Sequence, residues 1–183
     1  MRARRLGAMI LLPAGLGAWQ MQGDARWSPR VAVRPELAYT SYLGGQDGGS
    51  GGRAVDSANA VGTDANGMVY VTGFTMALDF PVLNPIDAPV LYSNGYYYED
   101  VFVSKSDPWS GKLIYSTTLG GPGTDIGYSL RVGVDGAAYV AGRAGTGFPY
   151  TRMAGEGCEN SVRTAFVLKL STSGERVEWA TCL

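Results

Sequence analysis

A nine-residue phrase recurs along this chain and limits its fold more than any other feature. Leu-Ala-Tyr-Thr-Ser-Tyr-Leu-Gly-Gly occupies residues 37–45 and returns as Leu-Ile-Tyr-Ser-Thr-Thr-Leu-Gly-Gly at residues 113–121. A shortened third copy, Val-Glu-Trp-Ala-Thr-Cys-Leu, occupies residues 177–183. Such repeats are typical of proteins built from similar supersecondary units that pack only against their neighbours.

The residues between the copies align as two repeat units, 37–112 and 113–176. Each unit carries a hairpin signal, Asn66-Gly67 or Asp135-Gly136, because both central residues of a type I′ turn need a positive φ. A second glycine follows six residues after the first in both units, whereas two loops differ in length. Equal strand spacing with variable loops predicts a packed sheet in each unit.

We therefore expect an all-β fold of propeller-type blades, each with four antiparallel strands. The chain supplies about two blades and one leading strand, Leu37–Leu43, and residues 177–183 are expected to close the second blade. Because a closed propeller needs about 4–8 blades, two blades cannot form a ring. Three arrangements stay open: a fragment of a longer repeat protein, several chains in one ring or stack, or a two-sheet sandwich. The first two predict self-association through unprotected strand edges.

The order of the motifs resembles the bacterial beta-propeller repeat (SBBP repeat) family. The resemblance covers residues 37–183 and rests on four features of the sequence. These are the opening phrase, the hairpin ending in Tyr-Val-x-Gly, Asp-Phe-Pro at residues 79–81, and Ala-Phe-Val-Leu-Lys at residues 165–169. It implies a secreted or surface-exposed bacterial protein made of repeated blades, and it implies no catalytic residues.

The N-terminal residues 1–25 have the pattern of a secretory signal peptide. Arg2, Arg4 and Arg5 precede an apolar run, and Gly-Asp-Ala at residues 23–25 matches a small-residue cleavage site, with Ala18 as a second candidate. The alternative is a buried or amphipathic helix. The apolar run is too short for a membrane span, so we expect a secreted or cell-surface protein with a linker at residues 26–36.

Composition narrows the function. The chain has no histidine, which excludes His-dependent acid–base catalysis and Ser-His-Asp triads. Its net charge is −1, so we expect no nucleic-acid partner. The leading hypothesis is a non-enzymatic module whose loops bind protein or carbohydrate. The alternatives are a carbohydrate-active hydrolase or lyase that uses carboxylates and tyrosines, and a structural surface or filament subunit.

A tyrosine-rich segment in the longest loop is the candidate binding site. Aromatic rings beside amides and carboxylates stack on sugars or form the energetic centre of protein interfaces. The alternative is that these tyrosines extend the next strand and pack against a neighbouring blade. The candidate residues are Tyr92, Asn94, Tyr96, Tyr97 and Tyr98.

Aspartates in the glycine-rich loops and turns are the candidate metal ligands. Calcium prefers such oxygen donors, and it is the one cofactor that the sequence suggests. The alternative is that each aspartate only caps a turn through its side chain. The candidates are Asp47, Asp56, Asp64, Asp125 and Asp135.

Two cysteines and two pairs of aromatic residues complete the expectations. In an exported protein Cys158 and Cys182 are expected to form a disulfide, the alternative being two free thiols. We expect Phe80 and Phe148 to plug loops. Trp109 and Trp179 are expected to pack in the core or between blades.

Overall fold

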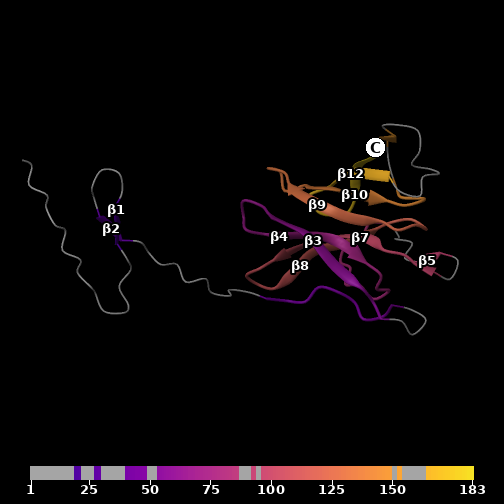
Figure 1. Cartoon of the computed structure of the whole chain (residues 1–183), viewed down its shortest axis with the longest axis horizontal. Coiled ribbons are helices and arrows are strands. Elements are labelled where there is room, and N and C mark those ends of the chain that lie inside the picture. The colour runs from indigo at the N-terminus through magenta and orange to yellow at the C-terminus, as the bar shows by residue number, and fades with distance from the viewer. Residues whose placement is uncertain are drawn as a thin grey trace, which may run out of the picture. The chain divides into compact units, whose positions relative to one another are not determined.

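The computed structural model describes residues 19–21, 27–29, 40–48, 53–86, 92–93, 96–149, 152–153 and 164–183. Every regular element in these ranges is a β-strand (Figure 1), so the all-β prediction is confirmed. In the same ranges no helix has the length and apolarity needed to cross a membrane. The chain divides into two units, residues 1–38 and residues 39–183.

The N-terminal unit contains one short hairpin. Strand β1 (Trp19–Met21) pairs antiparallel with β2 (Trp27–Pro29), and Trp19 lies opposite Pro29. The hairpin spans the boundary expected between the signal peptide and the linker. The rest of both predicted segments lies outside the described residues.

The first large sheet is an antiparallel meander of four strands in the order β3-β4-β7-β8. A small hairpin of β5 (Tyr92–Ser93) and β6 (Tyr96–Tyr97) follows β4 in the chain and precedes β7. The four strands of the sheet are β3 (Asp56–Thr63), β4 (Val69–Thr75), β7 (Asp100–Asp107) and β8 (Lys112–Leu119).

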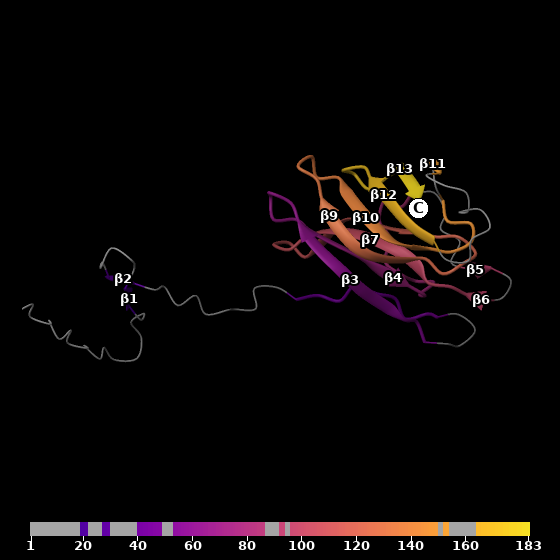
Figure 2. The same cartoon turned by 45° about the horizontal axis from the view of Figure 1, so that its top comes forward.

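The second large sheet repeats this meander and adds one strand at its edge. Its order is β11-β13-β12-β10-β9, and only the short β11 (Arg152–Met153) runs parallel to its neighbour. The two sheets lie as separate layers and do not close into a ring (Figures 1 and 2). The four meander strands are β9 (Ile126–Val132), β10 (Ala138–Ala144), β12 (Thr164–Leu170) and β13 (Val177–Cys182).

The two sheets share even their irregularities. The first and second strands of each sheet shift register beside a glycine, Gly73 in one and Gly142 in the other. A Cβ at these glycines would lie 1.7 Å from the Ser57 carbonyl oxygen or 2.0 Å from that of Ile126, so neither position tolerates a side chain. A second register shift follows Lys105 in one sheet and Lys169 in the other. The meander strands of the two units therefore correspond one to one in order and register.

The hairpin turns form where the sequence predicts them, but they are not of type I′. Gly67 and Gly136 have φ values of 78° and 81°, whereas Asn84 is the only described non-glycine residue with a positive φ. The amide of Gly67 donates to the Asp64 carbonyl, and the amide of Asp64 donates to that of Met68. Each turn is thus one residue longer than a two-residue hairpin, and only its glycine needs the left-handed conformation.

The prediction of a leading strand at Leu37–Leu43 is wrong for the part that the structure describes. Residues 40–45 form no strand, and the Tyr42 side chain is fully exposed. Its equivalent in the second copy, Thr118, is 2% exposed because β8 pairs with β7. No described strand pairs with residues 40–43, so the phrase alone does not form a strand.

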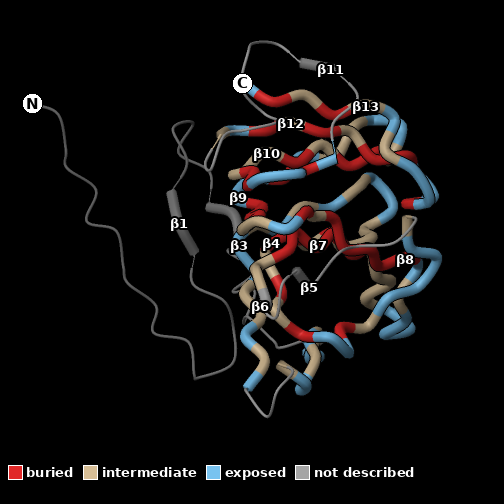
Figure 3. Tube along the Cα trace, turned by 90° about the vertical axis from the view of Figure 1, so that its right-hand side faces the viewer, coloured by how far each residue is buried: buried red, intermediate tan, exposed pale blue. Residues whose placement is uncertain are grey.

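One core joins the two sheets. β9 packs against β3 and β4, and the buried residues of the main cluster come from both sheets (Figure 3). A smaller cluster of Ala77, Phe80 and Phe102 covers the outer side of the first sheet, with Leu43 packed on it. The largest completely buried side chains of the main cluster are Tyr70, Tyr115, Leu130, Phe166, Leu168 and Leu170.

Candidate functional site

One face of the first sheet, here called the tyrosine face, packs against the second sheet. Tyr70 and Tyr115 are completely buried on it, and their rings meet edge to face at 6.4 Å. The Tyr70 hydroxyl donates to the Gly136 carbonyl of the second sheet at 2.9 Å. The Lys105 ammonium lies 4.8 Å from the centre of the Tyr70 ring and 3.5 Å from the Asp64 carboxylate.

The tyrosine face of the second sheet has the same construction. Strand register places Tyr139, Lys169 and Trp179 where Tyr70, Lys105 and Tyr115 lie in the first sheet. The rings of Tyr139 and Trp179 meet edge to face at 6.3 Å, and the Lys169 ammonium lies 5.5 Å from the Tyr139 ring centre.

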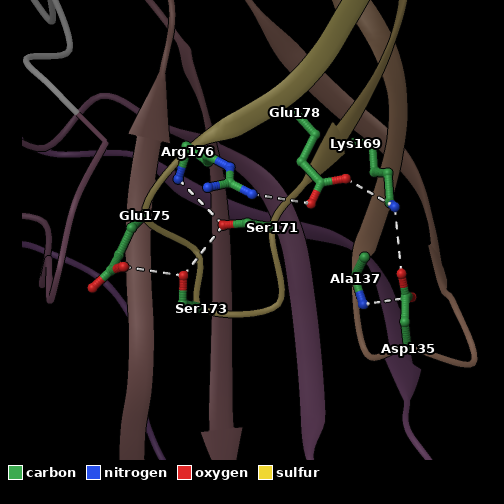
Figure 4. A network of polar contacts seen from close by, with 8 residues as sticks. All are labelled: Asp135, Ala137, Lys169, Ser171, Ser173, Glu175, Arg176 and Glu178. Atoms are coloured by element: carbon green, nitrogen blue, oxygen red, sulfur yellow. Dashed lines mark hydrogen bonds and ion pairs between the residues drawn. The ribbon is translucent and has the colours of Figure 1, made fainter.

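Lys169 also joins two acidic groups on this face. Its ammonium lies 3.3 Å from the Asp135 carboxylate and 2.9 Å from that of Glu178 (Figure 4). The hydrogen bond from Lys169 to Glu178 is the main reason that the Lys169 pKa is raised. The backbone amide of Ala137 donates to Asp135, which lowers the pKa of that carboxyl. The lysine is therefore held in place across the second tyrosine face.

The two tyrosine faces differ in what covers them. Val101 and Val103 are completely buried and Leu119 is 3% exposed in the first sheet. Their equivalents in the second sheet are exposed Ala165, half-buried Val167 and Leu183, which is 67% exposed. Tyr139 and Trp179 are likewise only half-buried. The described residues thus cover the first tyrosine face and leave the second one open.

A pocket marks one end of the open face. It has a volume of about 330 Å³ and is lined by Tyr128, Gly142, Arg143, Thr164 and Ala165. The Arg143 Nε atom is buried and has no hydrogen-bond partner among the described residues.

The start of β9 fills the equivalent place on the first sheet. A Cβ at Gly127 would lie 2.5 Å from the Thr72 hydroxyl oxygen and 3.3 Å from the Val101 side chain. The Asn59 side-chain amide also donates to the Gly127 carbonyl at 2.9 Å. The pocket is therefore the counterpart of a site that a neighbouring first strand occupies inside the chain.

The predicted tyrosine site falls partly outside the described residues. The β5-β6 hairpin places Tyr92 opposite Tyr97, and Tyr96 opposite Ser93. Tyr98 is half-buried, and Asn94 lies outside the described residues. A sugar-binding or protein-binding role for this segment stays a prediction.

The predicted calcium ligands that the structure describes serve turns and loops. Asp64 accepts bonds from the Asn66 and Met68 amides and from the Tyr70 hydroxyl. Burial, the largest single effect, raises the Asp64 pKa, but these bonds and the charge of Lys105 together lower it below its usual value. No group of three or more possible ligands comes together in the described ranges. Of the other candidates, Asp56 accepts from Gly45, Asp125 from Gly121 and Gly145, Asp135 from Ala137, and Asp47 pairs with Arg53 in a β-bridge. Calcium binding stays a prediction.

A buried carboxyl pair lies where the two sheets meet, and the sequence analysis missed one member. Asp100, at the start of β7, is completely buried, and neither of its oxygens has a described hydrogen-bond partner. Burial, followed by the charge of Asp125, raises the Asp100 pKa to about 8. Burial also raises the Asp125 pKa to about 6. The equivalent of Asp100 in the second unit is Thr164, so the repeat pattern gave no signal for it.

The expectations for the paired aromatic residues have different outcomes. Phe80 and Phe148 are buried and pack on the equivalent residues Phe102 and Phe166, at ring-centre distances of 4.9 and 4.5 Å. The prediction for Trp109 is wrong, since this residue lies in the β7-β8 turn and is 82% exposed.

Cys182 is buried and forms a disulfide bond. Its predicted partner Cys158 lies outside the described residues, so the pairing of the two cysteines stays a prediction.

Comparison with known protein families finds no match, and no curated protein matches the chain significantly.

Proposed function

We propose that this chain is an exported, non-enzymatic repeat module of the β-propeller type that binds another protein through the tyrosine face of its second sheet. The observation that carries the proposal is the open state of this face. Its equivalent in the first sheet is an established packing surface, in which Tyr70 and Tyr115 are completely buried. Tyr139 and Trp179 present the same aromatic pair half-exposed, and such residues carry much of the energy of protein interfaces.

The blade-like arrangement supports a propeller-type module. The two sheets contact each other mainly through β9, the first strand of the second meander. This strand packs against β3 and β4, the first two strands of the first meander. Propeller blades are likewise four-stranded sheets, repeated around a shared central axis. Each sheet also runs its four antiparallel strands in chain order, as a blade does.

Two further observations favour an exported binding module over a carbohydrate-active hydrolase or lyase. Asp100 and Asp125 are the described carboxyls with raised pKa values, but both side chains are completely buried. A sugar could not reach either carboxyl in the folded chain, because neither has exposed surface. The disulfide at Cys182 fits an oxidising compartment outside the cytosol.

Site-specific photo-crosslinking tests the proposal. The photoreactive amino acid p-benzoylphenylalanine would replace Trp179 in cells that produce the full chain. The matched control places it at Trp109, which is exposed but lies in a turn away from the tyrosine face. We expect a crosslinked polypeptide from position 179 and none from position 109, with the partner identified by mass spectrometry.

Rebinding with the purified partner then gives the quantitative result. Trp179→Ala is expected to weaken this binding roughly tenfold or more, because truncation of an aromatic residue at the energetic centre of an interface costs about 2 kcal/mol or more, and about 1.4 kcal/mol is a factor of ten. Equal crosslinking from both positions, or binding that Trp179→Ala leaves unchanged, would contradict the proposed function.

A further inference from the structure

We infer that the open tyrosine face receives the first strand, β3, of a second copy of this chain. The inference rests on the proposed function and names the partner. Inside one chain, the interface between the sheets joins the tyrosine face of one unit to the first strand of the next. This contact is head to tail, because it joins two different surfaces of the repeat unit. Each end of the pair of units therefore keeps one of these two surfaces without a partner unit, the tyrosine face at one end and the first strand at the other.

The two unused halves are both present and exposed. The second sheet supplies the open tyrosine face with its pocket. The first sheet supplies β3, on which Val61 is 66% exposed, whereas its equivalent Leu130 on β9 is 1% exposed. Val61 is therefore an exposed apolar side chain, whereas its counterpart Leu130 is buried by the contact between the two sheets.

The pocket identifies which part of β3 would enter. The equivalent place on the first sheet is filled by Gly127, and strand register makes Ala58 the equivalent of Gly127, since they lie opposite Gly73 and Gly142. Ala58 is exposed at the start of β3. In a second copy Ala58 would thus occupy the pocket beside Gly142 and Arg143.

The volumes of the contacting residues are complementary in this arrangement. Inside the chain Gly127 has no side chain and lies against Thr72. At the open end the entering residue, Ala58, is one methyl larger, and the equivalent of Thr72 is the smaller Ala141. Relative to the internal contact, the methyl group gained at Ala58 is matched by the atoms lost where Ala141 replaces threonine. A close-packed interface requires such a match.

The polar groups are also matched. The Tyr70 hydroxyl donates to the Gly136 carbonyl inside the chain, and the equivalent pair between copies is Tyr139 and the carbonyl of Gly67. The buried carboxyl pair of Asp100 and Asp125 has no counterpart between copies, because Thr164 replaces Asp100. The contact between copies therefore avoids the repulsion of two buried carboxyls.

Engineered cysteines test this contact directly. The full chain would be prepared as Ala58→Cys and, separately, as Ala141→Cys, and the two variants would be mixed under mild oxidation. We expect roughly tenfold more disulfide-linked dimer in the mixture than in either variant alone, because docking raises the effective concentration of the two thiols. The matched control mixes Ala141→Cys with Trp109→Cys, whose cysteine lies in an exposed turn.

Light scattering after size exclusion gives a second readout that needs no new thiol. We expect the unmodified chain to form assemblies above its monomer mass of 19.3 kDa, and Ala58→Arg to return them to monomers. Dimer in the control mixture at the level of the test mixture, or a monomer at all concentrations, would overturn the inference. A monomer that still crosslinks a different protein from position 179 would overturn the inference and leave the proposed function standing.

Discussion

The two sheets are the same structure in two environments. Both have the same strand order, the same register shifts, and an aromatic pair beneath a lysine at equivalent positions. Tyr115 is completely buried on the first sheet, whereas its equivalent Trp179 is half-buried on the second. Because the local structures agree, the difference in burial comes from the neighbour: the second sheet covers the first, and no described segment covers the second. A repeat unit is complete only when the next unit packs on it.

The largest expected effect compares Tyr115→Ala with Trp179→Ala. Loss of the completely buried Tyr115 ring should lower the free energy of unfolding by about 3–5 kcal/mol. Loss of the half-buried Trp179 ring should cost the monomer about 1–2 kcal/mol, since part of its area stays in water. Urea unfolding of dilute protein measures both values.

Tyr115→Phe is the matched control for this comparison. The Tyr115 hydroxyl is buried without a described hydrogen-bond partner, so its removal should leave stability equal or slightly higher. Equal losses for Tyr115→Ala and Trp179→Ala in the monomer would show that the second tyrosine face is covered.

The next effect concerns the carboxyl pair that only the internal contact possesses. The Asp100 pKa is raised to about 8 by burial, so the folded chain holds this proton while the unfolded chain, with a pKa near 3.8, releases it. The free energy of unfolding should therefore fall as the pH rises from about 4 to 8, by at most about 1.4 kcal/mol for each pH unit. Unfolding curves at pH 5, 6.5 and 8 measure this slope.

Asp100→Asn provides the control for the pH slope. The variant removes the titrating group and keeps its shape, so the slope between pH 6.5 and 8 should flatten. A smaller slope below pH 6 should remain, because the Asp125 pKa is about 6. An unchanged slope in Asp100→Asn would assign the effect to another group.

The sequence predicted the repeated sheets because their signals are local and occur twice. Turn glycines such as Gly67 and Gly136, which have a positive φ, are recognised from neighbouring residues alone. The same holds for alternating apolar residues, so both signals can be read without knowing the distant contacts. The leading strand failed because strand formation at residues 40–43 depends on a partner strand that the phrase does not contain. The prediction for Trp109 was wrong for a related reason. Its hydrophobicity favoured the core, but its position in a turn places it in solvent.

The open face could not be predicted from sequence at all. Tyr139 and Trp179 differ from Tyr70 and Tyr115 in their neighbours and hardly in residue type. Asp100 was missed because its surroundings, and not its position in a motif, give it an unusual pKa. Sequence patterns thus described what each unit is, whereas the site depends on how the units stack.

The most direct test of the account is the fluorescence of Trp179 as a function of chain concentration. Phenylalanine would replace the other three tryptophans, Trp19, Trp27 and Trp109, so that Trp179 alone reports. In dilute solution the half-buried indole should emit at a long, solvent-exposed wavelength. The account predicts a shift to shorter wavelength as concentration rises, when a second copy covers the tyrosine face, and Ala58→Arg should abolish the shift. An emission maximum that is independent of concentration in both chains would contradict the claim that this face completes itself with another unit.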